Sequence, residues 1–363
     1  MIAGWPVAFR PAGEIILKES RSTGKSDGQR RHNVSRRFTV SGSRPSHPPD
    51  AGPDFSLLTR FVQEAEAAGL DMVLLGDSAP VAGGPNRQMR FEATTLVAAL
   101  ATVTSRIGLV AAASTVAHQP YNLARRFASL DIISHGRAGW NASMMPDPRE
   151  AANFSRPEGF SGDDFRLRAE EFIGIVQGLW KGWDADALLF DKVGGRFFDP
   201  EKMHLFDHRG EYFSVRGPLN VARSPQDTPV LVMSGLSEPD TDIAARTADV
   251  VLLDKPSIEP AKAGDLKRRA LAFGRSPEAL KVLMNITASA EITAAPDLFA
   301  GRLEECFRSK ACDGFNIAMP FTSALDDFVG LVLPELRHRG LVRSGYSAAT
   351  LRAHLGLAGE DRQ

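Results

Sequence analysis

The stretch Arg106–Met144 constrains the fold of this chain more than any other, because it has the pattern strand, helix, strand with few residues to spare. The apolar run Ile107–Ala113 predicts a first buried strand, and Arg137–Asn141 predicts a second. Between them, Pro120 opens a segment whose apolar residues recur every three or four positions, as in a helix. Two parallel strands need a crossover of about this size, so the stretch is a βαβ unit.

Small polar residues stand at the ends of both predicted strands. Ser114 and Thr115 follow the first strand, and Asn141 and Ser143 end the second. In parallel barrels and sheets, ligands bind at the loops that follow the carboxyl ends of the strands. We therefore predict that these four side chains belong to one binding site at that end of the sheet.

Three long runs of sequence also resemble a known family, the bacterial-luciferase-like flavin-dependent monooxygenases. They are ASTVAHQPYNLARRFASLDIISHGRAGWN at 113–141, DHRGEYFSVRGPLN at 207–220 and PELRHRGL at 334–341. The nearest branch is that of the nitrilotriacetate and dibenzothiophene-sulfone monooxygenases. The resemblance extends from about Asp54 to Leu357. It implies an α/β fold, the (β/α)8 TIM barrel.

The resemblance also implies a chemistry. Members of this branch use reduced FMN (FMNH2) as cosubstrate and oxidise a small organic substrate with dioxygen through a flavin C4a-peroxide, so the cofactor does the hard chemistry. No G-x-G-x-x-G follows any predicted strand, which indicates that the chain does not reduce its own flavin with NAD(P)H. We therefore expect a two-component system with a separate NAD(P)H:flavin reductase, and a homo-oligomer, a dimer or a tetramer.

One turn departs from the family pattern. By the resemblance, Gly235 and Ser237 belong to a Gly/Ser-rich turn that binds the FMN phosphate at a helix N-terminus. Leu236, Pro239 and Asp240 do not fit, because Pro lacks an N–H donor and Asp adds negative charge, although Asp240 is also a good helix cap. The altered turn leaves a non-catalytic flavin-binding barrel open as an alternative. An F420-dependent oxidoreductase of the same superfamily is a second alternative, because it shares the scaffold.

Three further candidates come from the resemblance. Asp77 follows the second predicted strand, where the family has an acidic residue beside the flavin ring, but it could equally cap a turn. His47 is a catalytic candidate in a proline-rich loop, with a solvated side chain as the alternative. Phe165-Arg166 stands where relatives have Arg-Tyr, so Arg166 is either a phosphate ligand or a solvated helix residue.

The composition is that of an ordinary globular protein of 363 residues, with 43% hydrophobic residues and a net charge of −1. This charge gives no reason to expect nucleic acid or an anionic membrane as a partner. No apolar run reaches the ~18 residues of a membrane helix. Cys306 and Cys312 are too few for a disulfide framework and lack metal-ligand spacing, so we predict no metal and a cytoplasmic location.

We predict two parts of unequal size. Residues 1–36 are a basic extension, either disordered or the product of a start codon placed upstream of the true one. Residues 37–357 form a single flavin-binding barrel with an insertion at 184–226, after the fourth helix. Its eight strands are expected at 37–41, 72–76, 107–113, 137–141, 230–232, 250–253, 281–286 and 314–319.

Overall fold

The structure is a computed structural model that describes residues 37–42, 54–76, 91–145, 147–154, 158–254, 260–288, 291–319 and 323–357. The contacts between residues divide the chain into two units, residues 1–34 and 35–363. Every described residue belongs to the second unit. The candidate residues His47 and Asp77 lie outside the described residues.

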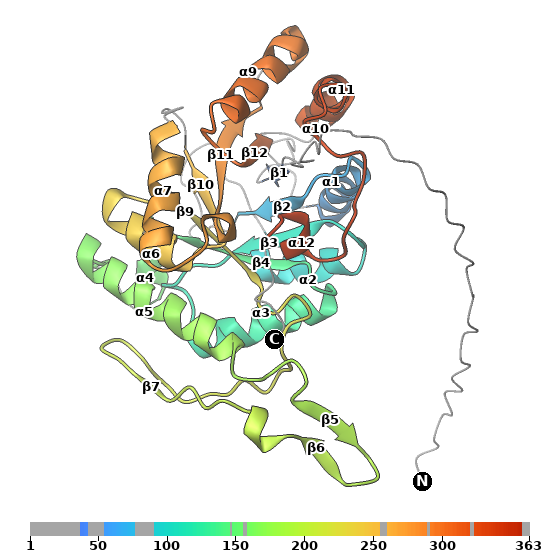
Figure 1. Ribbon diagram of the computed structural model, residues 1–363. Helices are drawn as coiled ribbons and strands as arrows, with labels where there is room; N and C mark the ends of the chain where they lie inside the picture. Colours follow the sequence, from blue (N-terminus) through green and yellow to red (C-terminus); the bar gives the residue numbers. More distant parts are fainter. Residues whose placement is uncertain are drawn as a thin grey trace, which may run out of the picture. The chain divides into compact units, whose positions relative to one another are not determined.

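Eight parallel strands form a closed barrel in the order β1-β12-β11-β10-β9-β4-β3-β2 (Figure 1). The strands are β1 (Arg37–Gly42), β2 (Met72–Leu75), β3 (Gly108–Ala112), β4 (Ala138–Ser143), β9 (Val230–Ser234), β10 (Val250–Leu253), β11 (Lys281–Thr287) and β12 (Gly314–Met319). Each lies within a residue or two of its predicted position, and the (β/α)8 prediction is confirmed. Both faces of a parallel sheet are covered, so its strands are nearly continuous apolar runs and are easily predicted.

Helices pack around the outside of this barrel (Figure 1). The longer ones are α1 (Phe55–Ala67), α2 (Ala93–Ala101), α3 (Pro120–Ile133), α5 (Gly162–Trp180), α6 (Thr241–Thr247), α7 (Pro260–Ala272) and α9 (Pro296–Arg308). The helical stretch between residues 323 and 338 is not one regular helix. It consists of α10 (Ser323–Asp327), a π-helical turn (Phe328–Val332) and α11 (Leu333–His338). Pro334 has no N–H for a regular helical bond, and the wider turn lies just before it.

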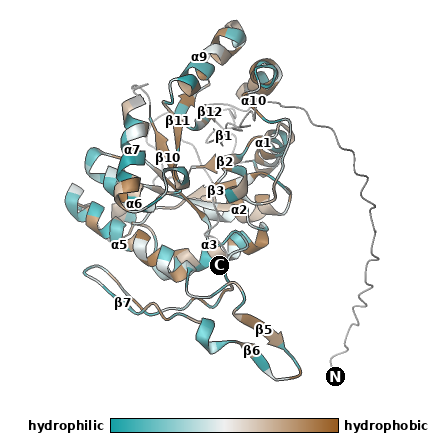
Figure 2. Cartoon of the chain, in the orientation of Figure 1, coloured by the Kyte–Doolittle hydropathy of each residue, from teal (hydrophilic) through white to brown (hydrophobic). Residues whose placement is uncertain are grey.

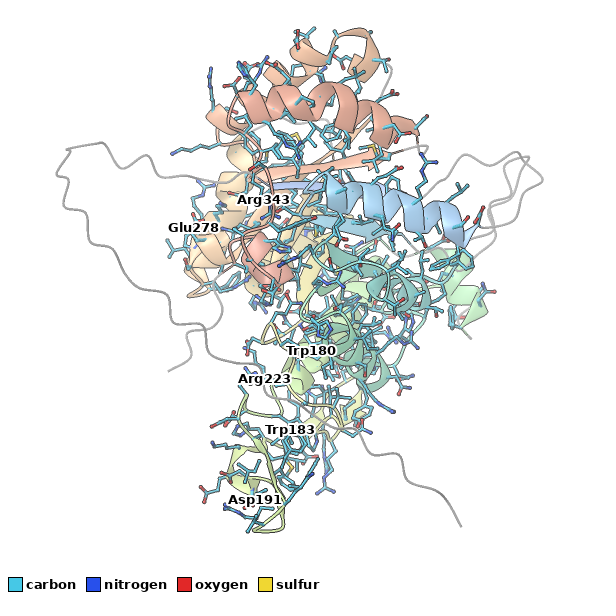
Figure 3. All side chains as sticks on the ribbon, turned by 90° about the vertical axis from the view of Figure 1, so that its right-hand side faces the viewer. Trp180, Trp183, Asp191, Arg223, Glu278 and Arg343 are labelled. Carbon is cyan, nitrogen blue, oxygen red and sulfur yellow. The ribbon has the colours of Figure 1, made fainter. Side chains whose placement is uncertain are left out.

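The predicted insertion contains two small antiparallel hairpins, β5 (Leu188–Asp191) with β6 (Arg196–Phe198) and β7 (His208–Arg209) with β8 (Ser214–Val215). The Trp183 indole donates to the carbonyl of Leu219 at 2.7 Å, and Arg223 donates to the carbonyl of Trp183 at 2.9 Å. Figure 3 shows Trp183 and Arg223 near the base of this segment and Asp191 at its far end. These bonds fasten the insertion where it leaves the barrel.

The largest apolar cluster lies between the strands and the helices, where Figure 2 shows the strands in brown and the outer helix faces partly in teal. Trp140 of β4 is fully buried there against Phe127 and Phe172, and its indole donates to the carbonyl of Ala113 at 2.9 Å. Side chains alternate along a strand, so Asn141 faces the barrel interior because Trp140 faces out.

A smaller apolar cluster fills the amino end of the barrel. It includes Val110, Val232 and Leu283 from the strands and Leu351 from the short helix α12 (Leu351–His354), which was not predicted. A Cβ on Gly108 would lie 2.4 Å from Leu351 Cδ1. The missing side chain of Gly108 therefore makes room for α12 to close this end of the barrel.

Candidate functional site

The other end of the barrel, where the strands have their carboxyl ends, has a polar interior. Above the apolar layer, the residues that alternation turns inward are Ser41, Asn141, Ser143, Ser234, Asn285, Thr287 and Asn316, and Asp254 follows β10 in the same pattern. This layer is where the sequence predicted a binding site. Its side chains offer hydroxyls, amides and one carboxylate, and among the described residues no group of His, Cys, Asp and Glu can hold a metal ion.

Three of the predicted site residues contain buried polar atoms without a hydrogen-bond partner. They are Thr115 Oγ1, Asn141 Oδ1 and Arg166 Nε, out of ten such side-chain atoms among the described residues. Thr115 is 1% exposed and Asn141 is 6% exposed, so both side chains are shielded from bulk solvent. An unsatisfied buried polar group costs roughly 1–3 kcal/mol, and a ligand that bonds to it removes this cost.

Ser114 and Ser143 make local bonds instead. The Ser114 hydroxyl accepts from the N–H of Val116 at 3.0 Å, which shapes the loop after β3. The Ser143 hydroxyl accepts from the N–H of Met145 at 3.3 Å, and Ser143 pairs in register with Ser234 of β9. The structure thus brings the ends of β4 and β9 side by side, as the sequence implied.

Gly235 packs closely against the end of β4. Its φ is +66°, a left-handed conformation that favours glycine, and an added Cβ would lie 3.1 Å from the Met145 Cβ and 3.4 Å from Ser143 Oγ. A larger residue at 235 would therefore push the two strand ends apart. Glycine at this position is required by the packing of the site.

In the turn that follows, Asp240 is a helix cap. Its buried carboxylate accepts from the N–H of Ser237 at 2.8 Å and from the Ser237 hydroxyl, which closes a capping box. Both donors of Ser237 therefore bond inside the chain. Of the two interpretations of Asp240, the structure shows the cap. The cation beside this turn, Arg269, pairs with Glu238 at 2.6 Å and with Asp242 at 2.8 Å.

Two arginines of α5 have different partners. Arg168, which the sequence did not single out, donates to the carbonyl of Thr115 at 2.7 Å and stacks over Phe213 at 4.7 Å. It fastens the Thr115 loop to α5. Arg166 is 3.5 Å from the carboxylate of the exposed Asp163, and its buried Nε has no partner. That N–H is available to an acceptor such as a phosphate oxygen.

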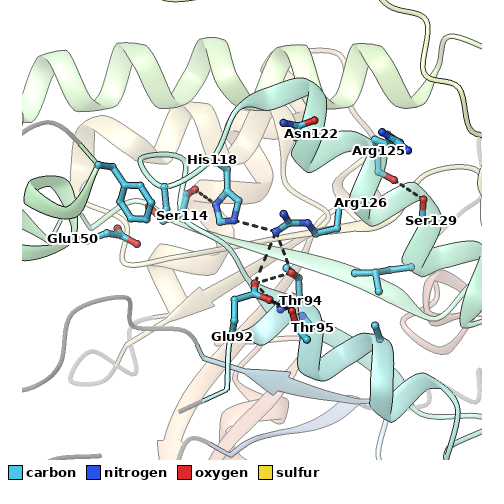
Figure 4. Close-up of a pocket in the computed structure, with 14 residues that line it drawn as sticks. Glu92, Thr94, Thr95, Ser114, His118, Asn122, Arg125, Arg126, Ser129 and Glu150 are labelled. Atoms are coloured by element: carbon cyan, nitrogen blue, oxygen red, sulfur yellow. Dashed lines mark hydrogen bonds and ion pairs between the residues drawn. The ribbon is translucent and has the colours of Figure 1, made fainter. Parts of the chain in front are cut away.

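A cavity of about 980 Å³ runs along α2 and α3 and reaches Ser114 (Figure 4). Its wall includes His118, whose Nδ1 is 2.9 Å from the carbonyl of Ser114 and whose Nε2 is 3.2 Å from Arg126 Nη1. A guanidinium only donates, so Nε2 accepts and Nδ1 carries the proton. Sequence reasoning missed His118, although a histidine in the loop after a barrel strand was a signal.

A row of hydrogen bonds crosses the polar layer on the opposite side of the barrel from β4. Asn316 donates from Nδ2 to Asn285 Oδ1 at 2.8 Å, and Asn285 donates to Asp254 Oδ1 at 2.6 Å. Thr39 donates to Asn316 Oδ1 at 3.0 Å. In the strand order, β12 is half-way round the barrel from β4, so the row faces Asn141 across the barrel mouth.

Two other observations bear on the chemistry. Cys306 and Cys312 are free and buried, and burial raises the pKa of the Cys312 thiol to about 12, so this thiol is not a nucleophile at neutral pH. Within the part of the chain that the structure describes, no helix is both long and apolar enough to cross a membrane.

The sequence and the structure can be compared with known proteins. The sequence pattern of the luciferase-like monooxygenase family matches residues 36–296. N-acetyl-S-(2-succino)cysteine monooxygenase of Bacillus subtilis (strain 168) is 34% identical, over 88% of this chain and 93% of the relative. Nitrilotriacetate monooxygenase component A of Aminobacter aminovorans is also 34% identical, over 90% of this chain and 96% of the relative.

Among solved structures, a riboflavin lyase with modified FMN and riboflavin superimposes with a TM-score of 0.78 at 26% identity, over 89% of this chain and 96% of that one. The expected resemblance is thereby confirmed at the level of sequence and of fold. The closed barrel and the two extensive matches agree. The chain belongs to the luciferase-like monooxygenase family, and it is a flavin-dependent monooxygenase.

Proposed function

We propose that this protein is the oxygenating component of a two-component monooxygenase, which takes FMNH2 from a separate NAD(P)H:flavin reductase and oxidises a small organic substrate with dioxygen. The observation that carries the proposal is the pair of buried, unpartnered atoms Thr115 Oγ1 and Asn141 Oδ1 at the carboxyl end of the barrel. A ligand that bonds to such atoms removes the free-energy cost of leaving them unsatisfied, which makes them candidate ligand contacts.

These atoms fit a flavin. The ring system and the ribityl chain of FMN carry N–H and O–H donors, and the Asn141 carbonyl oxygen is an acceptor with no other donor. Thr115 offers a hydroxyl of either role, Ser143 a second hydroxyl, and Gly235 a position without a side chain. When bound, reduced FMN supplies the electrons that activate dioxygen. The residues of this chain hold the ring, and the apolar layer below keeps water out.

The phosphate end fits less well. In the turn after β9, Ser237 already uses its N–H and its hydroxyl on Asp240. The Nε of Arg166 is the unpartnered donor that we propose for the phosphate instead. The reductase partner is supported by the name of one relative, which is component A of its enzyme, and by the absence of G-x-G-x-x-G from the sequence.

The test is stopped-flow mixing of anaerobic protein and photochemically reduced FMN with oxygenated buffer. We expect a transient spectrum distinct from those of reduced and oxidised FMN, and no NADH consumption by the protein alone. FMN is the first flavin to test, because the structurally similar riboflavin lyase contains a modified FMN. Reoxidation at the rate of protein-free FMNH2 would overturn the proposal and favour a non-catalytic barrel. Binding of F420 without such a transient would favour the F420-dependent alternative.

A further inference from the structure

The hydrogen-bond row at the barrel mouth has a direction. Asn316 accepts from Thr39 and donates to Asn285, which in turn donates to Asp254. A carboxylate only accepts, so Asp254 fixes the orientation of both amides, and one N–H of each points along the row toward it, while Asn316 also donates to Ser41 Oγ at 3.1 Å. The charge of Asp254 is therefore the end point of a network whose buried member, Asn316, is 3% exposed.

This carboxylate has no cationic partner in the described part of the chain. The Asn285 amide at 2.6 Å is the donor that reaches Asp254, which is itself exposed at the end of β10. Elsewhere in the same region the charges are matched, since Arg302 and Glu291 form an ion pair at 2.5 Å. Among the described residues, no ion pair balances the negative charge of Asp254.

A cavity of about 350 Å³ adjoins this carboxylate at the carboxyl ends of β10 and β11. Asp254, Asn285 and Thr287 contribute polar atoms to its wall, and Ile286 and Phe299 contribute apolar surface. The ion pair of Arg302 with Glu291 completes the wall, and its two charges offset each other. Its volume is at the lower end of the roughly 300–1,000 Å³ of ligand pockets, which suits a small molecule. The charges of the described wall residues therefore sum to −1, from Asp254, beside an apolar surface.

We propose that this cavity selects a substrate that carries a protonated amine on a small apolar body, with Asp254 as the residue that determines the preference for the cation. An ammonium group pairs with a carboxylate through short, charge-assisted hydrogen bonds, and the apolar body packs on Ile286 and Phe299. The inference rests on the proposed function, because it assigns the cavity to the substrate of that reaction. Carboxylate compounds, such as those in the names of the two relatives, are repelled by Asp254.

The test measures binding without turnover. The full chain is titrated with cyclohexylammonium, cyclohexanol and cyclohexanecarboxylate at pH 7.5 and low salt, with ligand-observed NMR as the readout. We expect the ammonium to bind at least about tenfold more tightly than the alcohol, on the scale of a hydrogen bond to a charged group. We expect the preference to shrink as salt screens the charge.

The variant Asp254→Asn removes the charge while keeping an oxygen that accepts from Asn285. It should reduce the preference for the ammonium to about twofold or less. Glu305→Gln is the matched control, because it removes one exposed carboxylate from α9 outside the cavity wall, and it should leave the preference unchanged. Equal preference in the parent and in Asp254→Asn, or no binding of the ammonium by the parent, overturns the inference.

The two proposals fail in different ways. Loss of the flavin transient with ammonium binding that still depends on Asp254 would reject the monooxygenase reaction and keep the cation site. A normal transient with no dependence on Asp254 would reject the cation site alone. The NMR titration needs no flavin, so the ammonium binding and the flavin transient are interpreted independently.

Discussion

The buried polar side chains at the two ends of the barrel differ in how completely they are hydrogen-bonded. At the amino end, Arg352 donates to both oxygens of Asp249, at 3.1 and 2.7 Å, and also to the carbonyl and the hydroxyl of Thr228. Gln226 donates to Asp131 and to the Ala138 carbonyl. At the carboxyl end, the side chains of the buried Thr115 and Asn141 have no bond of this kind.

Unpartnered atoms also occur at the amino end, but in another setting. Asp131 Oδ2 is unpartnered, while Asp131 Oδ1 accepts from the Ala138 N–H and from Gln226. The Ser224 hydroxyl lies close enough to lower the pKa of Asp131, without reaching hydrogen-bonding geometry. Arg337 Nε and His354 Nδ1 are also unpartnered at this end, but Asp131, Arg337 and His354 each bond through another polar atom of the same side chain. The carboxyl end leaves isolated atoms that only another molecule satisfies, which is the difference between a structural end and a binding end.

The largest effect should come from breaking the amino end. Arg352→Ala removes one partner of a largely buried ion pair, whose side chains are 14% and 12% exposed, and leaves Asp249 uncompensated. We expect a loss of about 3–5 kcal/mol in the free energy of unfolding. Urea unfolding of both proteins measures it.

The FMN affinity of the folded Arg352→Ala protein should equal that of the parent, because Arg352 lies at the far end of the barrel. Arg352→Lys, which keeps the charge, serves as the control and should lose less stability. A large fall in FMN affinity in protein that is still folded would contradict the separation of the two ends.

The second effect is a pH dependence at the same end. Burial raises the pKa of Asp131 to about 6, although bonds from Ala138 and Gln226 partly offset this. The folded state therefore holds a proton that the unfolded chain, with a pKa near 4, has lost. The unfolded state binds fewer protons between about pH 4 and 6, so Asp131 lowers stability as the pH rises through that window.

Asp131→Asn should remove this loss, because its carbonyl can still accept from Ala138 and Gln226 without a buried charge. We expect the variant to be more stable than the parent at pH 7.5 by on the order of 2 kcal/mol, and about equal at pH 4. Thermal melting across pH 4–8 measures the difference. A constant difference over that range would show that Asp131 does not titrate there.

The sequence predicted the carboxyl end better than the amino end, for physical reasons. The strands are long apolar runs, and the polar residues at their ends, such as Asn141 and Ser143, stand out against them. The helix α12, which closes the amino end of the barrel, was not predicted because its four residues are too few to show a helical period. Its position also depends on Gly108, which is far away in the sequence. Likewise, the row that ends at Asp254 joins four strands, and no local pattern predicts such a contact.

The third effect concerns the binding end. Asn141→Ala removes an unpartnered acceptor, so the protein without flavin should be no less stable than the parent and up to about 1 kcal/mol more stable. FMN affinity should fall by roughly fivefold, the equivalent of about 1 kcal/mol for one neutral hydrogen bond.

Calorimetry with FMN and a melting curve on each protein measure both quantities. Asn220→Ala, at an exposed position of the insertion, is the control and should change neither by more than about 0.5 kcal/mol. A less stable variant with unchanged FMN affinity would make Asn141 a structural residue like those of the amino end.

The smallest effect concerns the turn after β9. It tests whether the polar groups of this turn bond only to each other, as most of those at the amino end do. Asp240 closes the capping box with Ser237, and Asn can cap a helix nearly as well as Asp. Asp240→Asn should therefore change the free energy of unfolding by less than about 0.5 kcal/mol, whereas Asp240→Ala should cost about 1 kcal/mol. If the carboxylate faces only the cap, FMN affinity stays the same in Asp240→Asn at low and at high salt. Tighter FMN binding at low salt, with riboflavin unchanged, would mean that the phosphate meets this charge and that the turn belongs to the flavin site. A flavin titration at two salt concentrations separates the two results, because only a charge–charge interaction is screened.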